Sequence, residues 1–402
     1  TTDSDLQGIM TTEFGTRLEK VTTYGKATND QHHGITVAQV TGSAVSGTAN
    51  GVKIIGVDIT KEKTDSKGKK TVHPDPTLAA YNYLYNKGVR IYNQSFGIDD
   101  EVTTFNQSSA RYQINNGRTE EILGFYKTAV DNGALFIWAA GNDRFKNNPS
   151  LEGGLPYVFN ELEKGWINVV GLAKDRSLNP GSTDWSDLDR LNGAGVAKNW
   201  TVTAVSGITV QSKVNGVKGI YEMNGSSFAA PIVTGTAALI KEKYPWMTND
   251  QIRQTLFTTT DLTNTIVDPT NKRNVTSTPD SRYGWGMLNQ SRALKGPGAF
   301  MNVSSNRSAS KVFNANVPSG TTSYFDNDIF GDGGLLKRGF GTLHLTGNNT
   351  FSGGSIVRQG TLEIHQVHAS PIAIEAGGKL VLNPKAIVGY NVGDFELIED
   401  ID

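Results

Sequence analysis

Short runs of apolar and β-branched residues recur along the first half of the chain, and segments with helical spacing separate some of them. The apolar runs cover residues 52–59, 89–97, 134–142, 167–171 and 201–205. Residues 77–87 and 119–132 have apolar positions at helical spacing. Strands that alternate with helices indicate βαβ units. The pattern therefore predicts an α/β fold, in which a parallel sheet is covered by helices on both faces.

A longer run of small and apolar residues covers positions 223–240. It begins with Gly225, Ser226 and Ser227, and Pro231 lies where a proline is tolerated, in the first turn of a helix. The segment therefore predicts a buried helix with a serine at its entrance. Such a serine either caps the helix or lies where its N-terminus stabilises developing negative charge. This segment alone leaves both interpretations open.

Polar residues lie at the ends of two predicted strands and at the starts of two predicted helices. Ser95 and Asn142 close apolar runs, whereas His33 and Ser227 precede helical ones. In open α/β sheets, functional sites gather outside the carboxyl ends of the strands. We therefore expect these four side chains to converge on one edge of the sheet.

The last third of the chain has a different character. Residues 298–324 are rich in Ser, Asn and Thr, which predicts a linker between a domain at 1–297 and a second one at 325–402. In the second domain, Gly-Thr-Leu at 341 recurs at 360, and Gly-Lys-Leu follows at 378, so the repeat spacing is 19 and then 18 residues. Regular glycine turns between short strands predict a solenoid, namely the start of a right-handed parallel β-helix. A β-sandwich is the alternative.

Composition narrows the possible chemistry. The 402 residues carry a formal net charge of −1, which argues against a nucleic-acid partner. The absence of cysteine excludes disulfides, zinc–thiolate sites and a thiol nucleophile. No apolar run is long enough to span a bilayer, and no signal peptide opens the sequence. We expect the chain to be a mature or trimmed fragment of a longer precursor.

Several short motifs follow one another in a defined order. They are His33-Gly34, N-x-S-x-G at 93–97, A-A-G-N at 139–142, N-G-S-S-F-A-A-P at 224–231 and Y-G-W-G-M-L-N at 283–289. In this order they resemble the motifs of the subtilase family of serine proteases, over roughly residues 1–297. The resemblance implies a subtilisin-like fold and a serine endopeptidase. An esterase is disfavoured, because its G-x-S-x-G motif does not fit the residues around Ser227.

The resemblance also implies roles for individual residues. Ser227 is the expected nucleophile, because a serine hydroxyl attacks once a base removes its proton. His33 is the expected general base, favoured over His32 because a glycine follows it. Asn142 is the expected oxyanion donor, beside the backbone N–H of Ser227. Substrate binding is expected at Ser95, Phe96, Gly97, Ala140 and Gly141.

The carboxylate that orients the histidine has two candidates. Asp3 lies 30 residues before His33, the spacing that the resemblance implies, although Asp5 replaces the usual glycine of the motif. Asp58 follows the histidine in the chain, which is the wrong order for this family. We therefore assign the role to Asp3. A further departure is Gln39, which replaces the usual glycine in the helix after the histidine.

The tail carries a resemblance of its own. Residues 345–354, L-T-G-N-N-T-F-S-G-G, resemble a repeat of autotransporter passengers. This implies a secreted or surface-displayed virulence protease of a Gram-negative bacterium, whose precursor carries a signal peptide and an outer-membrane translocation barrel. We expect a monomer that acts on protein or peptide substrates, with no cofactor and no catalytic metal; structural calcium cannot be read from the sequence. The alternative is a catalytically weak head on an adhesive β-helix stem.

Overall fold

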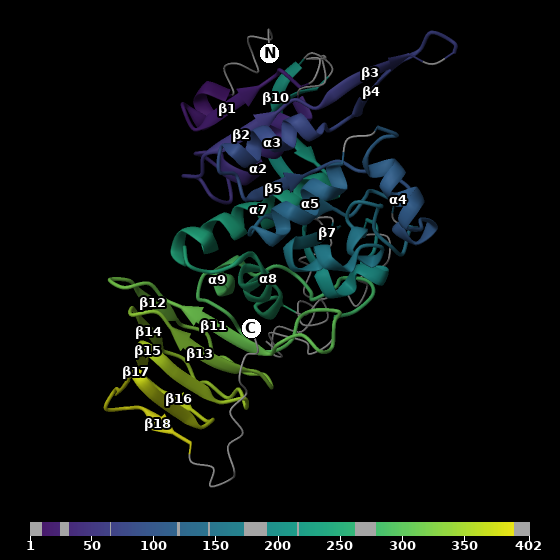
Figure 1. The fold of residues 1–402 in the computed structure, drawn as a ribbon. Coiled ribbons are helices and arrows are strands. Elements are labelled where there is room, and N and C mark those ends of the chain that lie inside the picture. The colour runs from purple at the N-terminus through teal and green to yellow at the C-terminus, as the bar shows by residue number, and fades with distance from the viewer. Residues whose placement is uncertain are drawn as a thin grey trace, which may run out of the picture. The chain divides into compact units, whose positions relative to one another are not determined.

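In a computed structural model, the chain folds into two compact units (Figure 1). The structure describes residues 10–24, 32–64, 66–118, 121–143, 145–172, 191–214, 217–261 and 279–389. The first unit contains residues 1–238 and 280–284, and we call it the α/β unit. The second contains residues 239–279 and 285–402, and we call it the stacked unit.

A four-stranded parallel sheet forms the centre of the α/β unit. Its strand order is β5 (Ile91–Gln94), β6 (Leu135–Ala139), β7 (Trp166–Leu172) and β8 (Thr201–Val205). Every residue of β6 and β7 is buried. Continuous burial explains why these strands have no polar alternation in sequence, since helices cover both faces of a parallel sheet. The prediction of a parallel sheet is confirmed.

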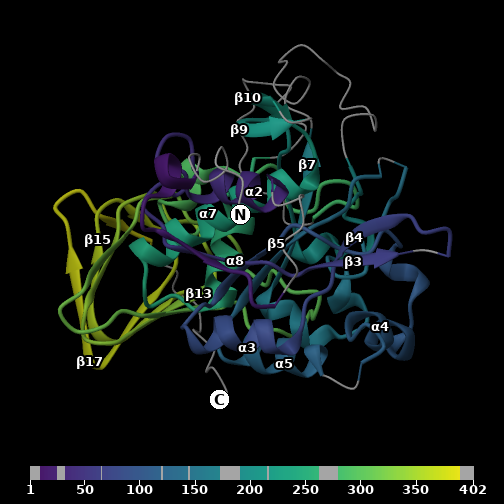
Figure 2. The same ribbon diagram turned by 90° about the horizontal axis from the view of Figure 1, so that it is seen from above.

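Helices cover both faces of this sheet, as predicted. On one face, Tyr126 of α5 (Ile122–Asp131) contacts Phe136 and Trp166, with ring centroids 5.0 and 5.3 Å away. Figure 2 shows α3 (Leu78–Asn86) and α5 together on one side of β5. On the other face, Thr234 of α7 (Ser226–Lys243) donates a hydrogen bond of 2.9 Å to Oδ1 of Asn93. Successive strand residues point to opposite faces, which places Asn93 towards α7.

The helix that begins at the paired histidines packs against α7 and a β-hairpin. Val37 and Val40 of α2 (His32–Gly42) form an apolar cluster with Phe228 of α7 and with the hairpin of β9 (Ile208–Val214) and β10 (Val217–Met223). Gln39 donates from Nε2 to the carbonyl of Gln211 at 2.8 Å, and its Oε1 accepts from the N–H of Gln211 at 3.2 Å. These two bonds give a structural reason for a glutamine where the resemblance leads us to expect glycine.

The remaining elements of the α/β unit lie outside the central sheet. The apolar run 52–59 contains β2 (Ile54–Val57), which is half-buried and pairs in parallel with β1 (Leu18–Val21). These elements are β1 (Leu18–Val21), β2 (Ile54–Val57), β3 (Thr60–Thr64), β4 (Lys70–Pro74), α4 (Gln107–Ile114), and the 3-10 segments Val102–Thr104, Leu155–Tyr157, Asn160–Gly165 and Gly195–Trp200. Within the described part of the chain, no helix combines the length and apolarity needed to cross a membrane.

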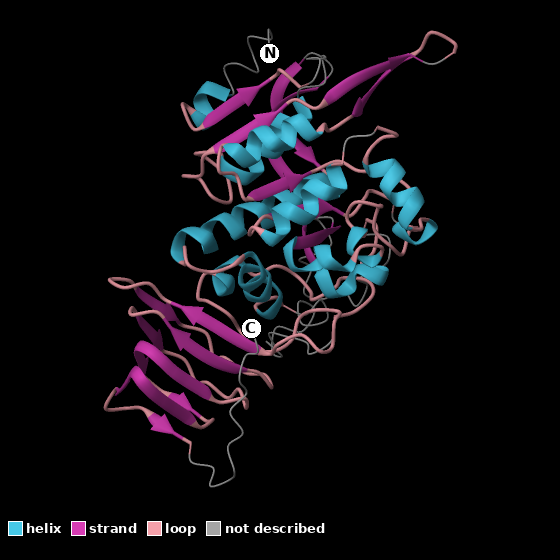
Figure 3. Ribbon diagram, viewed as in Figure 1, coloured by secondary structure: helices cyan, strands magenta, loops and turns pink. Residues whose placement is uncertain are grey.

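The stacked unit consists mainly of short parallel strands that lie one above the next (Figures 1 and 3). Its elements are α8 (Asn249–Thr258), α9 (Gln290–Ala293), β11 (Val312–Asn316), β12 (Thr322–Phe325), β13 (Gly334–Arg338), β14 (Thr342–Leu345), β15 (Ser355–Ile364), β16 (Val367–His368), β17 (Ile372–Leu382) and β18 (Ile387–Val388). Strands β11, β13, β15 and β17 form one parallel ladder, and β12, β14, β15 and β17 form another. Strands β16 and β18 form a third.

The register of these ladders follows the sequence repeat. Thr342 pairs with Thr361, and Thr361 pairs with Lys379, so equivalent positions are 19 and 18 residues apart. Alternate residues such as Leu343 and Leu362 point inward and are fully buried. Parallel rungs of this length on several ladders are the arrangement that the β-helix prediction requires.

The linker predicted at 298–324 requires correction, because β11 and β12 lie within it. Its polar residues alternate with buried ones, so Phe313 and Ser323 point inward. The hydroxyl of Ser323 accepts a hydrogen bond of 2.9 Å from Nε1 of Trp246. Most of the Ser and Asn residues of this segment lie in the bends and turns of 302–310, before β11 begins, so composition alone predicts a linker there.

Candidate active site

The serine at the start of α7 lies against the end of β5. The hydroxyl of Ser95 donates to the carbonyl of Ser227 at 2.8 Å, and the hydroxyl of Ser227 donates to the carbonyl of Ser95 at 3.3 Å. These reciprocal bonds join two segments that are far apart in sequence. The strand end and the helix start therefore meet, as the sequence pattern predicts.

The two neighbouring serines have different environments. Ser226 is 1% exposed, and its hydroxyl accepts from the N–H of Gly141 at 3.1 Å and donates to Oδ1 of Asn142 at 3.0 Å. Ser227 is half-buried, and among the described residues its hydroxyl makes only the long bond of 3.3 Å to the carbonyl of Ser95. The Ser226 hydroxyl therefore has a structural role, whereas the Ser227 hydroxyl is better placed to react.

The side chain of Asn142 has a defined orientation. Its Oδ1 accepts from the backbone N–H of Ser226 at 2.9 Å as well as from the Ser226 hydroxyl. Because a donor must face an acceptor, these bonds fix the amide oxygen towards Ser226 and direct the Nδ2 group away from it. Asn142 is exposed, so its two N–H donors are available to an incoming group at the entrance of α7.

The turn that carries Asn142 depends on a glycine and a distant asparagine. Gly141 has a φ of +118°, and a Cβ there would lie 2.6 Å from Oδ1 of Asn192. Asn192 accepts from the N–H of Asp143 at 2.8 Å and donates to the carbonyl of Asn148 at 3.0 Å. Sequence reasoning missed Asn192, because it lies about 50 residues from the motif and belongs to none of the motifs quoted above.

His33 is the second residue of α2 and is exposed. Its ring centroid lies 5.7 Å from that of Phe228, the residue that follows Ser227. The apolar cluster between α2, β9 and α7 holds Phe228 and therefore the serine beside it. The fold thus brings the predicted base against the residue that follows the predicted nucleophile.

Two further residues position the end of β5. Asn93 donates from Nδ2 to the hydroxyl of Ser95 at 2.8 Å, while its Oδ1 accepts from Thr234. Thr234 lies two turns into α7, so this chain of bonds ties the Ser95 hydroxyl to the helix that begins at Ser226. Asn93 was visible as the first residue of the N-x-S-x-G motif, whereas nothing in the sequence indicated Thr234.

A buried carboxyl lies beside the segment expected to bind substrate. The Oε2 atom of Glu152 accepts from the N–H of Ile98 at 2.9 Å, and a Cβ on Gly97 would come within 3.0 Å of it. Burial raises the pKa of Glu152 to about 7, and the nearby charge of Asp99 raises this pKa as well. Phe96 packs edge-on against Trp138 at 5.4 Å, while Ala140 is fully buried.

Of the two carboxylate candidates, Asp3 lies outside the described residues, and its role stays a prediction. The side chain of His32 is likewise outside the described part. Asp58 is described, and its Oδ1 accepts from both the N–H and the hydroxyl of Thr60, at 2.9 and 2.6 Å. These bonds give Asp58 a local role in a turn at the end of β2.

Together, the fold and these contacts define an α/β protein with a helix-initiating serine at the carboxyl edge of a parallel sheet. The sequence model of the subtilase family matches residues 5–286, more than half of the chain. The chain therefore belongs to the subtilase family. A second model, the passenger-associated transport repeat, matches residues 335–364 in the stacked unit.

Curated relatives include secreted bacterial proteins. The chain is 31% identical over 341 residues to the Neisserial autotransporter lipoprotein NalP of Neisseria meningitidis serogroup B, covering 77% of this chain and 29% of the relative. It is 30% identical over 297 residues to an extracellular serine protease of Serratia marcescens, covering 63% of this chain and 27% of the relative. The chain therefore spans less than a third of the length of these relatives.

Among solved structures, the prenylagaramide maturation protease PagA matches with a TM-score of 0.45 and 19% identity, covering 72% of this chain and 97% of that one. The self-cleaved protease domain of PatA matches with a TM-score of 0.46 and 19% identity, covering 71% and 91% of the two chains.

Proposed function

We propose that this chain is the protease-bearing part of a secreted or surface-displayed serine endopeptidase, in which Ser227 forms an acyl-enzyme. The proposal rests on the different hydrogen bonding of two neighbouring serines at the start of α7. The Ser226 hydroxyl is occupied by Gly141 and Asn142, while Ser227 is half-buried beside the His33 segment. Membership of the subtilase family supports the same assignment.

The proposed reaction uses groups of the protein alone. His33 accepts the hydroxyl proton of Ser227 as the oxygen attacks the scissile carbonyl carbon. The tetrahedral oxyanion receives hydrogen bonds from Nδ2 of Asn142 and from the N–H of Ser227, which lies in the first turn of α7. His33 then gives its proton to the leaving amine, and a water molecule, activated by His33 in turn, releases the acyl group. Asp3 orients the imidazole.

The segment from Ser95 to Gly97 is the proposed docking site for the substrate backbone. Strand β5 pairs with β6 over Ile91–Gln94, and the chain continues past this ladder towards the serine. An extended peptide adding to this segment would place its scissile bond beside Ser227, as in recognition by an added β-strand.

The relatives support the proposed location and partners. NalP is named an autotransporter lipoprotein, and the Serratia relative is named an extracellular serine protease. We therefore propose protein or peptide substrates, display at or release from the outer membrane of a Gram-negative bacterium, and a translocation barrel in the precursor. We further propose that the chain acts as a monomer and binds no nucleic acid.

A pair of neighbouring serine variants tests the nucleophile. Ser227→Ala should abolish casein cleavage and labelling by a serine-directed phosphonate, because it removes the attacking oxygen. Ser226→Ala is the matched control and should keep phosphonate labelling, at a reduced rate, because it loosens Asn142. Equal casein cleavage by wild type and Ser227→Ala would refute the proposal. A wild-type protein that binds host cells without turnover would instead support the adhesive alternative.

A pair of aspartate variants tests the orienting carboxylate. Asp3→Asn should lower kcat by about 10,000-fold, the effect typical of a triad carboxylate. Asp58→Asn should change kcat little, because its Oδ1 is already engaged by Thr60. The reverse result would transfer the role to Asp58.

A further inference from the structure

Two histidines and one glutamate meet on the outer face of the stacked unit. His344 lies on β14, Glu363 lies on β15, and His365 follows β15 directly. His344 pairs with Glu363 across the two parallel strands, so their side chains lie on the same face. His365 is two residues beyond Glu363 and shares that face, whereas Ile364 between them is fully buried.

The ligand atoms of the three side chains lie close together, and each imidazole nitrogen approaches a different oxygen of the Glu363 carboxylate. Nδ1 of His344 lies 2.9 Å from Nε2 of His365 and 3.5 Å from Oε2 of Glu363. Nε2 of His365 lies 3.1 Å from the other oxygen of Glu363. In a tetrahedral zinc site with bonds of about 2.0–2.1 Å, two ligand atoms are about 3.3 Å apart. The three distances, 2.9, 3.1 and 3.5 Å, are therefore close to the spacing of ligand atoms in such a site.

The orientation of the two imidazoles also suits a cation. Their nitrogens face each other at 2.9 Å, so one must donate a proton to the lone pair of the other when no metal is bound. A metal ion that binds both lone pairs takes the place of that proton. The ring of Tyr324 stacks on His344 with a centroid distance of 4.3 Å and an interplanar angle of 15°, which fixes the plane of this ligand.

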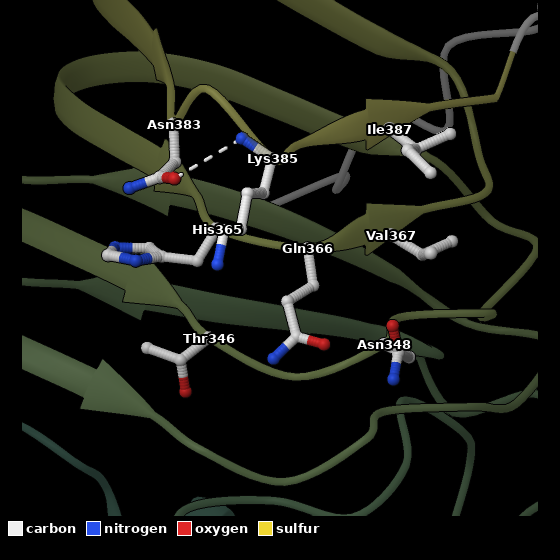
Figure 4. A pocket seen from close by; sticks show the side chains of 8 residues that line it. All are labelled: Thr346, Asn348, His365, Gln366, Val367, Asn383, Lys385 and Ile387. Atoms are coloured by element: carbon white, nitrogen blue, oxygen red, sulfur yellow. Dashed lines mark hydrogen bonds between the residues drawn. The ribbon is translucent and has the colours of Figure 1, made fainter.

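The site is also reachable from solvent. The side chains of His344, Glu363 and His365 are 13%, 25% and 27% exposed. His365 lines an open pocket of about 570 Å³ together with Thr346, Asn383 and Lys385 (Figure 4). Three protein ligands with solvent on one side leave room for a water molecule as the fourth ligand.

We propose that His344, Glu363 and His365 bind a divalent transition-metal ion, with zinc as the best fit. Imidazole nitrogen with a single carboxylate suits zinc, whereas calcium takes six or more oxygen ligands. Among the described residues, this is the group of histidine and acidic side chains whose ligand atoms lie close enough together to hold a metal. The ion would join two successive rungs of the stack, β14 and β15, and thereby stabilise their register.

Equilibrium dialysis against zinc chloride tests this site on the full chain, in a Ser227→Ala background that prevents self-cleavage. We expect one zinc ion per chain. His344→Ala and His365→Ala should lose it, and Glu363→Gln, which keeps the shape of the side chain, should weaken binding at least 10-fold. His73→Ala is the matched control, since His73 is exposed on β4 and contacts Thr71, and it should bind zinc like the parent.

Cobalt(II) gives a second readout, because its visible absorption reports the coordination geometry directly. Visible absorption typical of a tetrahedral cobalt site should appear in the parent and in His73→Ala, and should be lost in His365→Ala. A parent that binds no stoichiometric zinc overturns the proposal. So does zinc that survives in the His344 and His365 variants but is lost in His33→Ala, because it would lie at the active site. Neither result depends on proteolysis, so the site and the proposed function fail separately.

Discussion

The α/β unit and the stacked unit assemble their polar clusters in different ways. In the α/β unit, three separate segments contact the start of α7: Ser95 bonds to Ser227, Asn142 bonds to Ser226, and His33 lies against Phe228. In the stacked unit, His344 and Glu363 meet because they occupy equivalent positions of consecutive repeats. The first cluster depends on the whole topology, whereas the second depends on the register of two strands.

Each unit also buries a titratable side chain, which is an acid in the α/β unit and a base in the stacked unit. Glu152 is buried in the α/β unit, and His368 is fully buried in the stacked unit, where its Nε2 lies 3.2 Å from the hydroxyl of Ser355. Burial disfavours the charged form of both groups, so it raises the pKa of the acid and lowers that of the base. The same physical cause therefore gives the two units opposite responses to acid.

Of the changes that compare the two units, the one with the largest expected effect lowers the rate in the α/β unit. Asn142→Ala should lower kcat for peptide hydrolysis by about 100- to 1000-fold, because it removes the side-chain donor for the oxyanion. The free energy of unfolding should change by about 1 kcal/mol or less, since the residue is exposed and water can replace its bonds to Ser226. Steady-state kinetics and urea unfolding of the same preparation measure the two quantities.

A substitution in the stacked unit provides the control for this prediction. Arg358 and Glu375 form an exposed ion pair on β15 and β17 with an N–O distance of 2.7 Å. Arg358→Ala should leave kcat unchanged and cost about 0–1 kcal/mol of stability. If Arg358→Ala lowered kcat as much as Asn142→Ala, the separation of chemistry and scaffold between the two units would be wrong.

The next effect is the pH dependence of the α/β unit. The pKa of Glu152 is raised from 4.5 to about 7 by burial, so the folded state keeps a proton that the unfolded state releases near pH 4.5. Stability from this group is complete below pH 4.5 and is lost as pH rises to about 7, by about 3 kcal/mol in total. Glu152→Gln should remove this slope in urea unfolding measured in the Ser227→Ala background. An unchanged slope would show that the carboxyl is ionised in the folded state.

His368 should act in the opposite direction. Burial lowers its pKa from 6.5 to about 4, so the unfolded state takes up a proton that the folded state rejects. Stability from this group is complete above pH 6.5 and is lost as pH falls towards 4, again by about 3 kcal/mol. His368→Gln should flatten the acid limb of the stability curve, measured by urea unfolding between pH 4 and pH 7.

The sequence predicted most of the α/β unit for a physical reason. Strand β6 is a continuous apolar run and β7 is apolar apart from Asn168, as expected for a parallel sheet that is covered on both faces. The linker prediction at 298–324 was wrong where β11 and β12 form. Phe313 and Ala315 of β11 point inward at a period of two, but this short pattern follows turns rich in Ser and Asn, which are typical of a linker.

Residues of the candidate site could be predicted where they lie in a contiguous motif. They could not be predicted where they act through contacts between positions far apart in the sequence. Ser227, Asn142 and His33 lie in short motifs, so their sequence neighbours identified them. Thr234 and Asn192 act through bonds to residues about 140 and 50 positions away, and such bonds leave no trace in a single sequence. The proximity of His344 and Glu363 was implicit in the 19-residue repeat, because both follow Gly-Thr-Leu.

The smallest expected effect concerns the side chains that cap helix N-termini, which should contribute equally to stability in both units. Thr77 caps α3 by accepting from the N–H of Ala80 at 3.2 Å. Thr248 caps α8 by accepting from the N–H of Gln251 at 3.2 Å, and the Gln251 side chain returns a bond of 2.9 Å to the N–H of Thr248. Each Thr→Ala change should cost about 1 kcal/mol, because it leaves one helix-terminal N–H without its side-chain acceptor.

Hydrogen exchange of the two helices, followed by mass spectrometry, measures both caps in one experiment. We expect Thr77→Ala to speed exchange in the first turn of α3 and Thr248→Ala to do so in α8, by about 5-fold each, which corresponds to about 1 kcal/mol. Gln251→Ala removes the returning half of the capping box and also the bond from Nε2 to the carbonyl of Asn314, so it should speed exchange in α8 as well. If one cap mattered and its counterpart did not, helix stability would be set by packing within that unit rather than by the cap itself.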